Sequence, residues 1–389
     1  FVAETIYDIV RWNRLYAEIA EVKVPFDRDN IWRLFSVWCI LRGIKLPDWN
    51  QIGDVPERRI KGRFAELSKT RKFRESIPDW MDELCLSELG EDVWTKEIAA
   101  LNEQAKVILR TNTLNISKEI LQKKLRTENV ITEFVPNHPD ALLLPERANV
   151  FRTEAFHNGF FEVQDASSQL VAAYLDVKPG MKVVDTCAGA GGKTLAMAAM
   201  MENKGTIYAC DVHSRRLEQM SKRAKRAGVH NIRSHVLSSE NDKWVKKHVK
   251  MADTVLIDAP CNGAGTWRRS PDSRWNIQQE NLDNLVALQQ SILSSAQRLV
   301  KPGGRLLYAT CSLLREENEL QIDAFLAANP DFEVDAFELP KTLADNPTKF
   351  YTSGHEVRTY PAMSSTDGFY VAKLRRKEAA PEPNPKSEG

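Results

Sequence analysis

The sequence predicts an α/β protein: a doubly wound parallel sheet, preceded by a small α/β module and a mainly helical N-terminal region. Two observations support this fold class. From about residue 156, apolar runs typical of buried strands alternate with amphipathic segments typical of helices, as in repeated β-α-β units. Turn signals rich in Pro and Gly, such as Lys178-Pro179-Gly180, precede these strands. We therefore expect a Rossmann-like domain over residues 156–376.

The first 95 residues carry helical periodicity and few strand signals. Apolar side chains recur at spacings of three and four, which predicts one buried helix face, at Ile31, Leu34, Phe35 and Trp38. Residues 58–74 are rich in Arg and Lys. Such a segment is either a solvated, mobile connection or a stretch that contacts phosphate groups, so the region 1–95 is a candidate for nucleic-acid binding.

Residues 96–155 change character and fit a small α/β module. Short strands are predicted at residues 107–112, 131–136 and 141–146. A helix is predicted over residues 117–129, with Ser117 as its N-cap. We expect this module to be a second candidate for nucleic-acid recognition, with exposed basic groups such as Arg110 on its sheet.

In the region 156–376, strands and helices follow one another in a regular order. The strands are predicted at residues 181–187, 205–211, 231–237, 253–260 and 303–311. Helices are predicted over residues 193–201 and 214–228. The Pro-rich, charged tail at 377–389 is predicted to be disordered.

The composition is that of an ordinary globular protein. Hydrophobic residues make up 42% and charged residues 28%, and the net charge of +1 decides nothing about nucleic acid. No apolar run of ~18 residues or signal peptide is visible, so we expect no membrane partner. Because Phe1 stands where an initiator Met is expected, we expect an internal or processed fragment.

The cysteines are far apart in the sequence and form no C-x-x-C pair or His/Cys spacing typical of a metal site. They are Cys39, Cys85, Cys187, Cys210, Cys261 and Cys311. In a chain of this length, such cysteines indicate reduced thiols in a cytoplasmic protein rather than a disulfide framework. We expect no bound metal and a monomer.

A Gly-rich turn over residues 185–194 joins the first strand of the main domain to its helix, where the backbone can approach a ligand closely. A P-loop would need Gly at position 187, which is Cys, and a dinucleotide fingerprint would need Gly at 194, which is Thr. Asp211 ends the second strand, where a carboxylate can accept both ribose hydroxyls, or alternatively cap the next helix. This combination favours S-adenosylmethionine.

Two cysteines follow the fourth and fifth strands, Cys261 in "DAPC" and Cys311 in "TCS". A buried cysteine is often only a small hydrophobic residue. If these strands are neighbours, about 4.8 Å apart, both thiols share one cleft beside the cofactor. A thiolate beside a methyl donor suits C5 of a pyrimidine, because addition at C6 makes C5 nucleophilic. Asp258 would then hydrogen-bond the N3/N4 edge of a cytosine.

Several stretches together resemble the RsmB/Fmu/Sun-type family of RNA 5-methylcytosine methyltransferases, which also includes the eukaryotic nucleolar Nop/NSUN proteins. They are "FFEVQDASSQL" (160–170), the loop 185–194, "DAPCNGAGTWRRSPD" (258–272), "TCSLLREEN" (310–318) and "DGFYVAKLRR" (367–376). The resemblance covers residues 78–376. It implies a class I methyltransferase fold, S-adenosyl-L-methionine as the cofactor and RNA as the substrate.

The resemblance also implies roles for individual residues. Cys311 would be the nucleophile, Cys261 would assist release, and Asp258 would orient the base. DNA cytosine-C5 enzymes instead use the Pro-Cys position, and geometry does not choose between the thiols, whereas the motif context favours Cys311. The cofactor contacts would come from Asp185, Cys187, Ala188, Gly189, Ala190, Gly191, Gly192, Lys193, Asp211 and Asp258.

This sequence departs from the family pattern at several positions. Asn262 and Ala264 stand where Ser and Thr are frequent, and Gly189-Ala190 where Ala-Pro is frequent. The acidic residue expected after the third strand, near the adenine, is replaced by Leu237 or Ser238.

Basic residues near the site predict RNA contacts. Arg268, Arg269 and Arg274 follow the Pro-Cys motif, and we expect at least one of them to contact phosphate. A second basic cluster, on residues 214–228, is better explained as a solvated helix face. We expect 16S-type rRNA as the substrate. The alternatives are a tRNA substrate, or a non-catalytic ribosome-assembly factor, against which the two cysteines and Asp258 argue.

Overall fold

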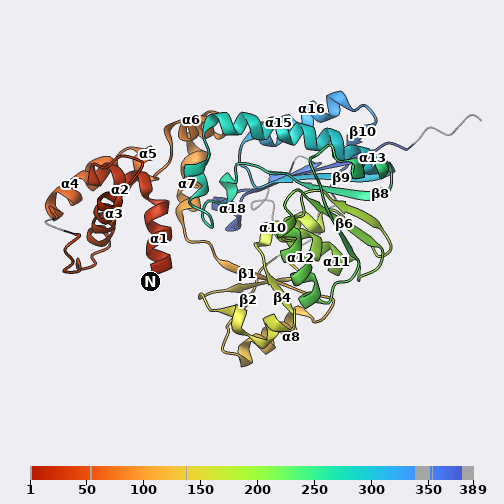
Figure 1. The fold of residues 1–389 in the computed structure, drawn as a ribbon, viewed down its shortest axis with the longest axis horizontal. Helices are drawn as coiled ribbons and strands as arrows, with labels where there is room; N and C mark the ends of the chain where they lie inside the picture. Colours follow the sequence, from red (N-terminus) through yellow and green to blue (C-terminus); the bar gives the residue numbers. More distant parts are fainter. Residues whose placement is uncertain (1, 53–54, 137, 338–350, 353, 379–389) are drawn as a thin grey trace, which may run out of the picture. The chain divides into compact units, whose positions relative to one another are not determined.

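The computed structural model describes residues 2–52, 55–136, 138–337, 351–352 and 354–378 (Figure 1). The chain divides into two compact units. The first comprises Phe1–Gln104 and Thr266–Asn281, and the second comprises Ala105–Gly265 and Leu282–Gly389. Most of the tail predicted to be disordered, residues 379–389, lies outside the described residues. No helix in the described part of the chain has the length and apolar character needed to cross a membrane.

The first unit is helical. Its helices are α1 (Val2–Arg11), α2 (Asn13–Ala20), α3 (Arg28–Leu41), α4 (Glu57–Leu67), α5 (Arg71–Arg74), α6 (Asp79–Leu89), α7 (Glu91–Asn102) and α14 (Ser273–Asn276). Leu34 and Trp38 of α3 are buried in its core, as their spacing predicts. Ile31 is 54% exposed, so the prediction is wrong there. Ile31 lies in the first turn of α3, which Asp27 caps, and none of the core residues covers it.

The basic segment 58–74 forms α4, α5 and the turn between them, not an extended connection. Several of its charges are paired within the unit. Arg63 binds the Glu21 carboxylate at 3.0 Å, and Arg71 binds Asp82 at 2.9 Å. Pairing of this kind reduces the charge available to a phosphate backbone, which favours a structural role for these arginines.

The second unit begins with a small antiparallel sheet of strand order β2-β3-β1-β4. Its strands are β1 (Val107–Thr111), β2 (Glu133–Phe134), β3 (Ala141–Leu144) and β4 (Phe161–Val163). Two helices pack with it, α8 (Lys118–Thr127) and α9 (Glu154–His157). Ser117 caps α8, accepting from the Ile120 backbone at 3.4 Å. The sheet extends to Val163, beyond the boundary predicted at residue 155, because β4 pairs with β1.

The large sheet has the order β11-β12-β13-β9-β8-β5-β6-β7, with β10 paired to β13. The parallel strands are β5 (Lys182–Asp185), β6 (Thr206–Asp211), β7 (Ile232–Val236), β8 (Ala252–Asp258) and β9 (Val300–Thr310). The antiparallel strands are β10 (Phe332–Val334), β11 (Tyr351–Thr352), β12 (Glu356–Thr359) and β13 (Phe369–Arg376). The predicted α/β class is confirmed. The sheet is mixed rather than wholly parallel, because the C-terminal strands return antiparallel.

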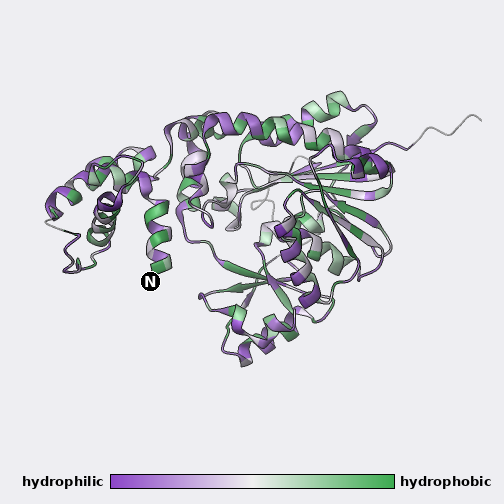
Figure 2. Ribbon diagram, in the orientation of Figure 1, coloured by the Kyte–Doolittle hydropathy of each residue, from purple (hydrophilic) through white to green (hydrophobic). Residues whose placement is uncertain are grey.

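Helices of the second unit connect these strands. They are α10 (Ala166–Ala173), α11 (Gly192–Met200), α12 (Ser214–Ala227), α13 (Lys243–Lys247), α15 (Gln279–Ala296, which begins in the first unit), α16 (Glu319–Ala328) and α18 (Pro361–Ser364). In Figure 2, α12 is largely hydrophilic, whereas the central strands are largely hydrophobic.

The central strands are apolar on both faces because the sheet is covered on both faces. Val183 packs in one hydrophobic cluster, while its neighbour Val184 packs in the other. Leu256 and Ile257 of β8 divide in the same way. The strand order reverses between β5 and β8, and ligands of such sheets bind outside the carboxyl ends at this point.

Candidate active site

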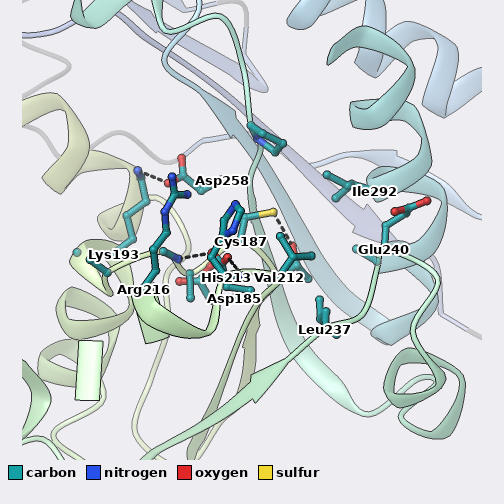
Figure 3. A pocket seen from close by; sticks show the side chains of 18 of the residues that line it. Asp185, Cys187, Lys193, Val212, His213, Arg216, Leu237, Glu240, Asp258 and Ile292 are labelled. Atoms are coloured by element: carbon teal, nitrogen blue, oxygen red, sulfur yellow. Dashed lines mark hydrogen bonds and ion pairs between the residues drawn. The ribbon is translucent and has the colours of Figure 1, made fainter. Parts of the chain in front are cut away.

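A cavity of about 480 Å³ lies at the carboxyl ends of β5, β6 and β8 (Figure 3). Its volume falls within the range of small-molecule sites, roughly 300–1,000 Å³. Every predicted cofactor residue except Gly191 lines it: Asp185, Cys187, Ala188, Gly189, Ala190, Gly192, Lys193, Asp211 and Asp258. Leu237 and Glu240 line the wall after the third strand, whereas Ser238 is not among the lining residues.

The Gly-rich loop has backbone conformations that residues other than glycine rarely adopt. Gly189 and Gly191 have φ angles of 54° and 85°. A Cβ atom at Gly191 would lie 2.3 Å from Cγ of Met220 on α12. Glycine at this position therefore allows both the left-handed backbone and the close approach of α12. The loop ends at the N-terminus of α11, whose first residues Gly192 and Lys193 line the cavity.

Asp211 holds the loop against the end of β6. Its carboxylate accepts from the Gly189 backbone at 2.8 Å through one oxygen and from the His213 backbone at 2.8 Å through the other. A carboxylate has about four acceptor positions, so each oxygen retains capacity for a ligand hydroxyl. Since Asp211 lines the cavity, this geometry suits the two hydroxyls of a ribose.

Asp185 provides a test of whether the site fits S-adenosylmethionine. Its Oδ2 accepts from the Thr194 hydroxyl at 2.7 Å. Its Oδ1 is buried and has no hydrogen-bond partner among the described residues. Burial raises the pKa of Asp185 to about 7, and the Thr194 bond only partly opposes this. A cationic donor would satisfy Oδ1 and restore the charge, and the α-amino group of the cofactor is such a donor, so the residues present fit it.

Lys193 and Asp258 form an ion pair at the mouth of the same cavity. Lys193 Nζ lies 2.6 Å from Asp258 Oδ2 (Figure 3). Burial alone would lower the pKa of Lys193, but the Asp258 carboxylate outweighs it and raises that pKa. Lys193 therefore remains a cation, and it fixes the orientation of the carboxylate of Asp258, the last residue of β8.

The two predicted catalytic cysteines meet. β8 and β9 are parallel neighbours, with Asp258 paired to Ala309, and the Sγ atoms of Cys261 and Cys311 lie 3.3 Å apart. The hydrogen bond to Cys311 and then burial raise the pKa of Cys261 well above its usual value. Cys261 is thus a protonated thiol within hydrogen-bond distance of the Cys311 sulfur, and either thiol can be the donor.

A buried carboxylate that the sequence analysis missed, Glu317, joins the two cysteine loops. Its Oε1 accepts from the backbone of Asn262 at 2.9 Å and from Nε2 of Gln289 at 3.0 Å. Asn262 Nδ2 in turn donates to the Ser312 hydroxyl at 2.8 Å, next to Cys311. Burial raises the pKa of Glu317, although these donors oppose the shift. The motif "TCSLLREEN" contained Glu317, but nothing in its spacing indicates burial.

The predicted RNA-contacting arginines do not share one environment. Arg274 is fully buried in the helical unit, where Nη1 donates to Asn102 Oδ1 at 2.9 Å. Arg268 is also buried, and its carbonyl accepts from Arg11 at 3.1 Å. Both side chains are buried in the helical unit, which argues against phosphate contact by them. Arg269, which is half-buried, is the remaining candidate.

Arg110, predicted to be exposed, is also buried, and the basic cluster on α12 is only partly solvated. Arg216 and Arg223 of α12 line the cavity, whereas Lys222 and Lys225 are exposed. The prediction of a solvated helix face therefore holds for only part of this helix.

Comparison with known proteins gives the family. Residues 172–375 match the family described as 16S rRNA methyltransferase RsmB/F, and residues 77–151 match its ferredoxin-like domain. The chain is 34% identical over 302 residues to the probable ribosomal RNA small subunit methyltransferase B of Synechocystis sp., an alignment that covers 77% of this chain and 67% of the relative.

Solved structures agree. The crystal structure of PH0851 superposes with a TM-score of 0.82 at 28% identity, covering 96% of this chain and 89% of the other. A methyltransferase homolog protein from Pyrococcus horikoshii gives a TM-score of 0.66 at 29% identity, covering 80% and 99%. The predicted family, methyltransferase class and S-adenosylmethionine cofactor are confirmed. The chain belongs to the RsmB/F family of 16S rRNA methyltransferases.

Proposed function

We propose that this protein transfers a methyl group from S-adenosylmethionine to C5 of a cytosine in 16S-type ribosomal RNA, with Cys311 as the covalent nucleophile. The observation that carries the proposal is the pair of thiols 3.3 Å apart, at the ends of adjacent strands. N-methylation of an amine would need no cysteine, whereas methylation at C5 needs a nucleophile that adds to C6.

Different residues of the cavity would bind different parts of the cofactor. Asp211 would accept the ribose hydroxyls, Asp185 the α-amino group, and Leu237 would pack against the adenine. When bound, the cofactor supplies the electrophilic methyl group.

The reacting groups act in sequence. The Cys311 thiol gives up its proton and its sulfur adds to C6, while N3 of the base gains a proton. The Asp258 carboxylate, fixed by Lys193, accepts hydrogen bonds from the N3–H and N4 amino groups and so stabilises the adduct. After methyl transfer, C5 carries both a proton and a methyl group. Removal of that proton restores the double bond and breaks the bond between C6 and sulfur.

The geometry gives a reason for Cys261 to become a base at the right stage. Its pKa is raised chiefly by the hydrogen bond to Cys311. Once the Cys311 sulfur is bonded to C6, it is a poor acceptor, so the largest cause of the raised pKa of Cys261 is removed and the thiol can release its proton to solvent. A Cys261 thiolate can then take the C5 proton, which assigns the release step to this residue.

The RNA substrate is supported by the family rather than by a charged surface. Among the arginines predicted to contact RNA, Arg269 is the one we retain, together with the exposed Lys222 and Lys225 of α12. We assign further RNA binding to the helical unit. An enzyme that acts on ribosomal RNA works where ribosomal subunits assemble, which in a bacterium is the cytoplasm.

The test is methyl transfer in vitro from labelled S-adenosylmethionine to three RNAs: protein-free 16S-type rRNA, assembled small subunits and tRNA. Digestion and mass spectrometry identify the product. We expect 5-methylcytosine in the protein-free rRNA, since the target base must be unstacked to reach the thiol. Label on tRNA alone would move the substrate to tRNA, and label on an exocyclic amine would refute the chemistry.

A further inference from the structure

Two arginines hold the backbone of the cofactor loop through its carbonyl groups: Arg223, which lines the cavity, and Arg110, which does not. Arg223 of α12 donates from Nη1 to the carbonyl of Ala190 at 2.6 Å. Arg110 of β1 donates from Nη1 to the carbonyl of Gly192. These two carbonyls bracket Gly191, whose left-handed backbone sets the direction of the turn. The loop therefore depends on side chains that its own sequence does not contain.

The small antiparallel sheet orients both arginines. Arg110 on β1 lies opposite Glu162 on β4 in the register of that sheet. The Glu162 carboxylate accepts from Arg223 Nε at 3.1 Å and pairs with Arg223 Nη2 at 3.0 Å. Its other oxygen accepts from Arg226, the neighbouring arginine on α12. The two contacts from Arg223 Nε and Nη2 to one Glu162 oxygen fix the Arg223 guanidinium in the position from which Nη1 reaches Ala190.

Burial separates this cluster from the RNA surface. Arg110 is 6% exposed, and Glu162 is 4% exposed. Burial lowers the pKa of Arg110 to about 10, so it remains charged near neutral pH. A buried cation is costly unless its donors are used, and Arg110 uses Nη1 on Gly192 and on the Gln164 side chain. No phosphate can approach it without unfolding the contact.

The same segment also reaches the cavity directly. Val163, Gln164 and Ser168, which follow Glu162 in the chain, line the cavity. Gln164 donates to the Ser168 hydroxyl at 3.1 Å while accepting from Arg110. The small module thus supplies both part of the cavity wall and the support of the loop opposite.

We propose that Arg110, Glu162 and Arg223 are positioning residues for the cofactor loop, so that the small α/β module is part of the cofactor site. This inference rests on the proposed function, since it concerns how that cofactor is held. Loss of either loop contact lets the Gly191 turn relax. The cost appears in the affinity for cofactor, while RNA binding and the chemical step at saturating cofactor change little.

The test compares two arginines that share Glu162 but differ in reach. Arg223→Lys keeps the charge and loses the contact with the Ala190 carbonyl. Arg226→Lys is the matched control, because Arg226 also binds Glu162 but makes no hydrogen bond to the described residues of the loop. Arg110→Lys is a second variant. Arg110 does not line the cavity, so a loss of affinity in this variant cannot come from a lost direct contact with the ligand. S-adenosylhomocysteine affinity is measured by calorimetry, and KM for each substrate by methyl transfer.

We expect Arg223→Lys and Arg110→Lys to weaken S-adenosylhomocysteine binding about tenfold, the effect of one charge-assisted hydrogen bond. KM for S-adenosylmethionine rises similarly, KM for RNA and kcat stay within about twofold, and Arg226→Lys behaves as wild type. Wild-type affinity in Arg223→Lys, or equal weakening in Arg226→Lys, overturns the inference. Should Arg110→Lys fail to fold, Glu162→Gln takes its place, because Glu162 also does not line the cavity. A wild-type protein that does not bind the ligand refutes the proposed function instead.

Discussion

The cofactor loop and the thiol pair occupy the same edge of one sheet, but they are held in different ways. The loop is fixed through its backbone. Its glycines have positive φ angles, two arginine side chains donate to its carbonyl groups, and Asp211 accepts from the Gly189 N–H. The thiols are fixed through side chains, by the buried network around Glu317. The first arrangement adapts to a ligand that enters and leaves. The second keeps two sulfur atoms at one separation through a covalent step.

This contrast predicts that changes at the loop alter affinity, and that changes at the thiols alter the rate of chemistry.

The largest effect is expected for Cys311→Ala. Without a nucleophile nothing adds to C6, so methyl transfer should fall by about four orders of magnitude or more. S-adenosylhomocysteine affinity, measured by calorimetry, should stay within about twofold, because Cys311 is not among the residues lining the cavity. A large loss of affinity in this variant would break the distinction between the two regions.

Asp211→Ala tests the loop. It removes the acceptor of the Gly189 N–H and of the ribose hydroxyls, so cofactor affinity should fall about 10- to 100-fold. At saturating cofactor, kcat should remain close to wild type. Glu218→Ala is a control at an exposed carboxylate on α12 that does not line the cavity. Calorimetry that gives unchanged affinity for Asp211→Ala would sink the ribose assignment.

Glu317→Gln tests the network under the thiols. The amide replaces one acceptor oxygen with a donor, which then faces donors from Asn262 or Gln289. We expect kcat to fall about tenfold and the free energy of unfolding to fall by about 1–3 kcal/mol. Cofactor affinity should be unchanged. Equal losses in kcat and affinity would show that the network supports both regions.

The smallest effect is a pH dependence from Asp185, whose pKa is about 7 in the free protein. Cofactor binding needs the ionised carboxylate, so affinity should be about tenfold weaker at pH 6 than at pH 8. Asp185→Asn should bind more weakly and without this pH dependence. Since the folded pKa lies above the unfolded value of about 3.9, the contribution of Asp185 to stability is lost as pH rises from about 4 to 7. Thermal unfolding of the ligand-free protein should therefore give a lower melting temperature at pH 7 than at pH 5. A higher melting temperature at pH 7 would contradict this expectation.

The sequence predicted the parts of the site that depend on local signals. The Gly-rich turn, Asp211 and the two strand-ending cysteines each follow from a strand that ends and a helix that begins, and parallel pairing then brings them together. Buried strands with apolar residues on both faces are likewise recognisable from composition.

Contacts between residues distant in sequence were not predictable. Arg110 resembles a surface residue until the pairing of β1 with β4 and the packing against Gly192 are known. Arg274 follows the Pro-Cys motif but folds into the helical unit, where Asn102 binds it. Glu317 is an ordinary charged residue in the sequence, and only the closing of β8 onto β9 buries it. The antiparallel strands β12 and β13 are not part of β-α-β units, so the sequence did not indicate where they pair in the sheet.

The most direct test of the account is which thiol forms the bond to RNA. Cys261→Ala and Cys311→Ala are each incubated with substrate RNA and S-adenosylmethionine, then run on denaturing gels with and without reductant. The account predicts a stable adduct with Cys261→Ala, resistant to reductant, because attack and methyl transfer proceed while release fails. It predicts none with Cys311→Ala. A persistent adduct in Cys311→Ala and none in Cys261→Ala would contradict it and make Cys261 the nucleophile.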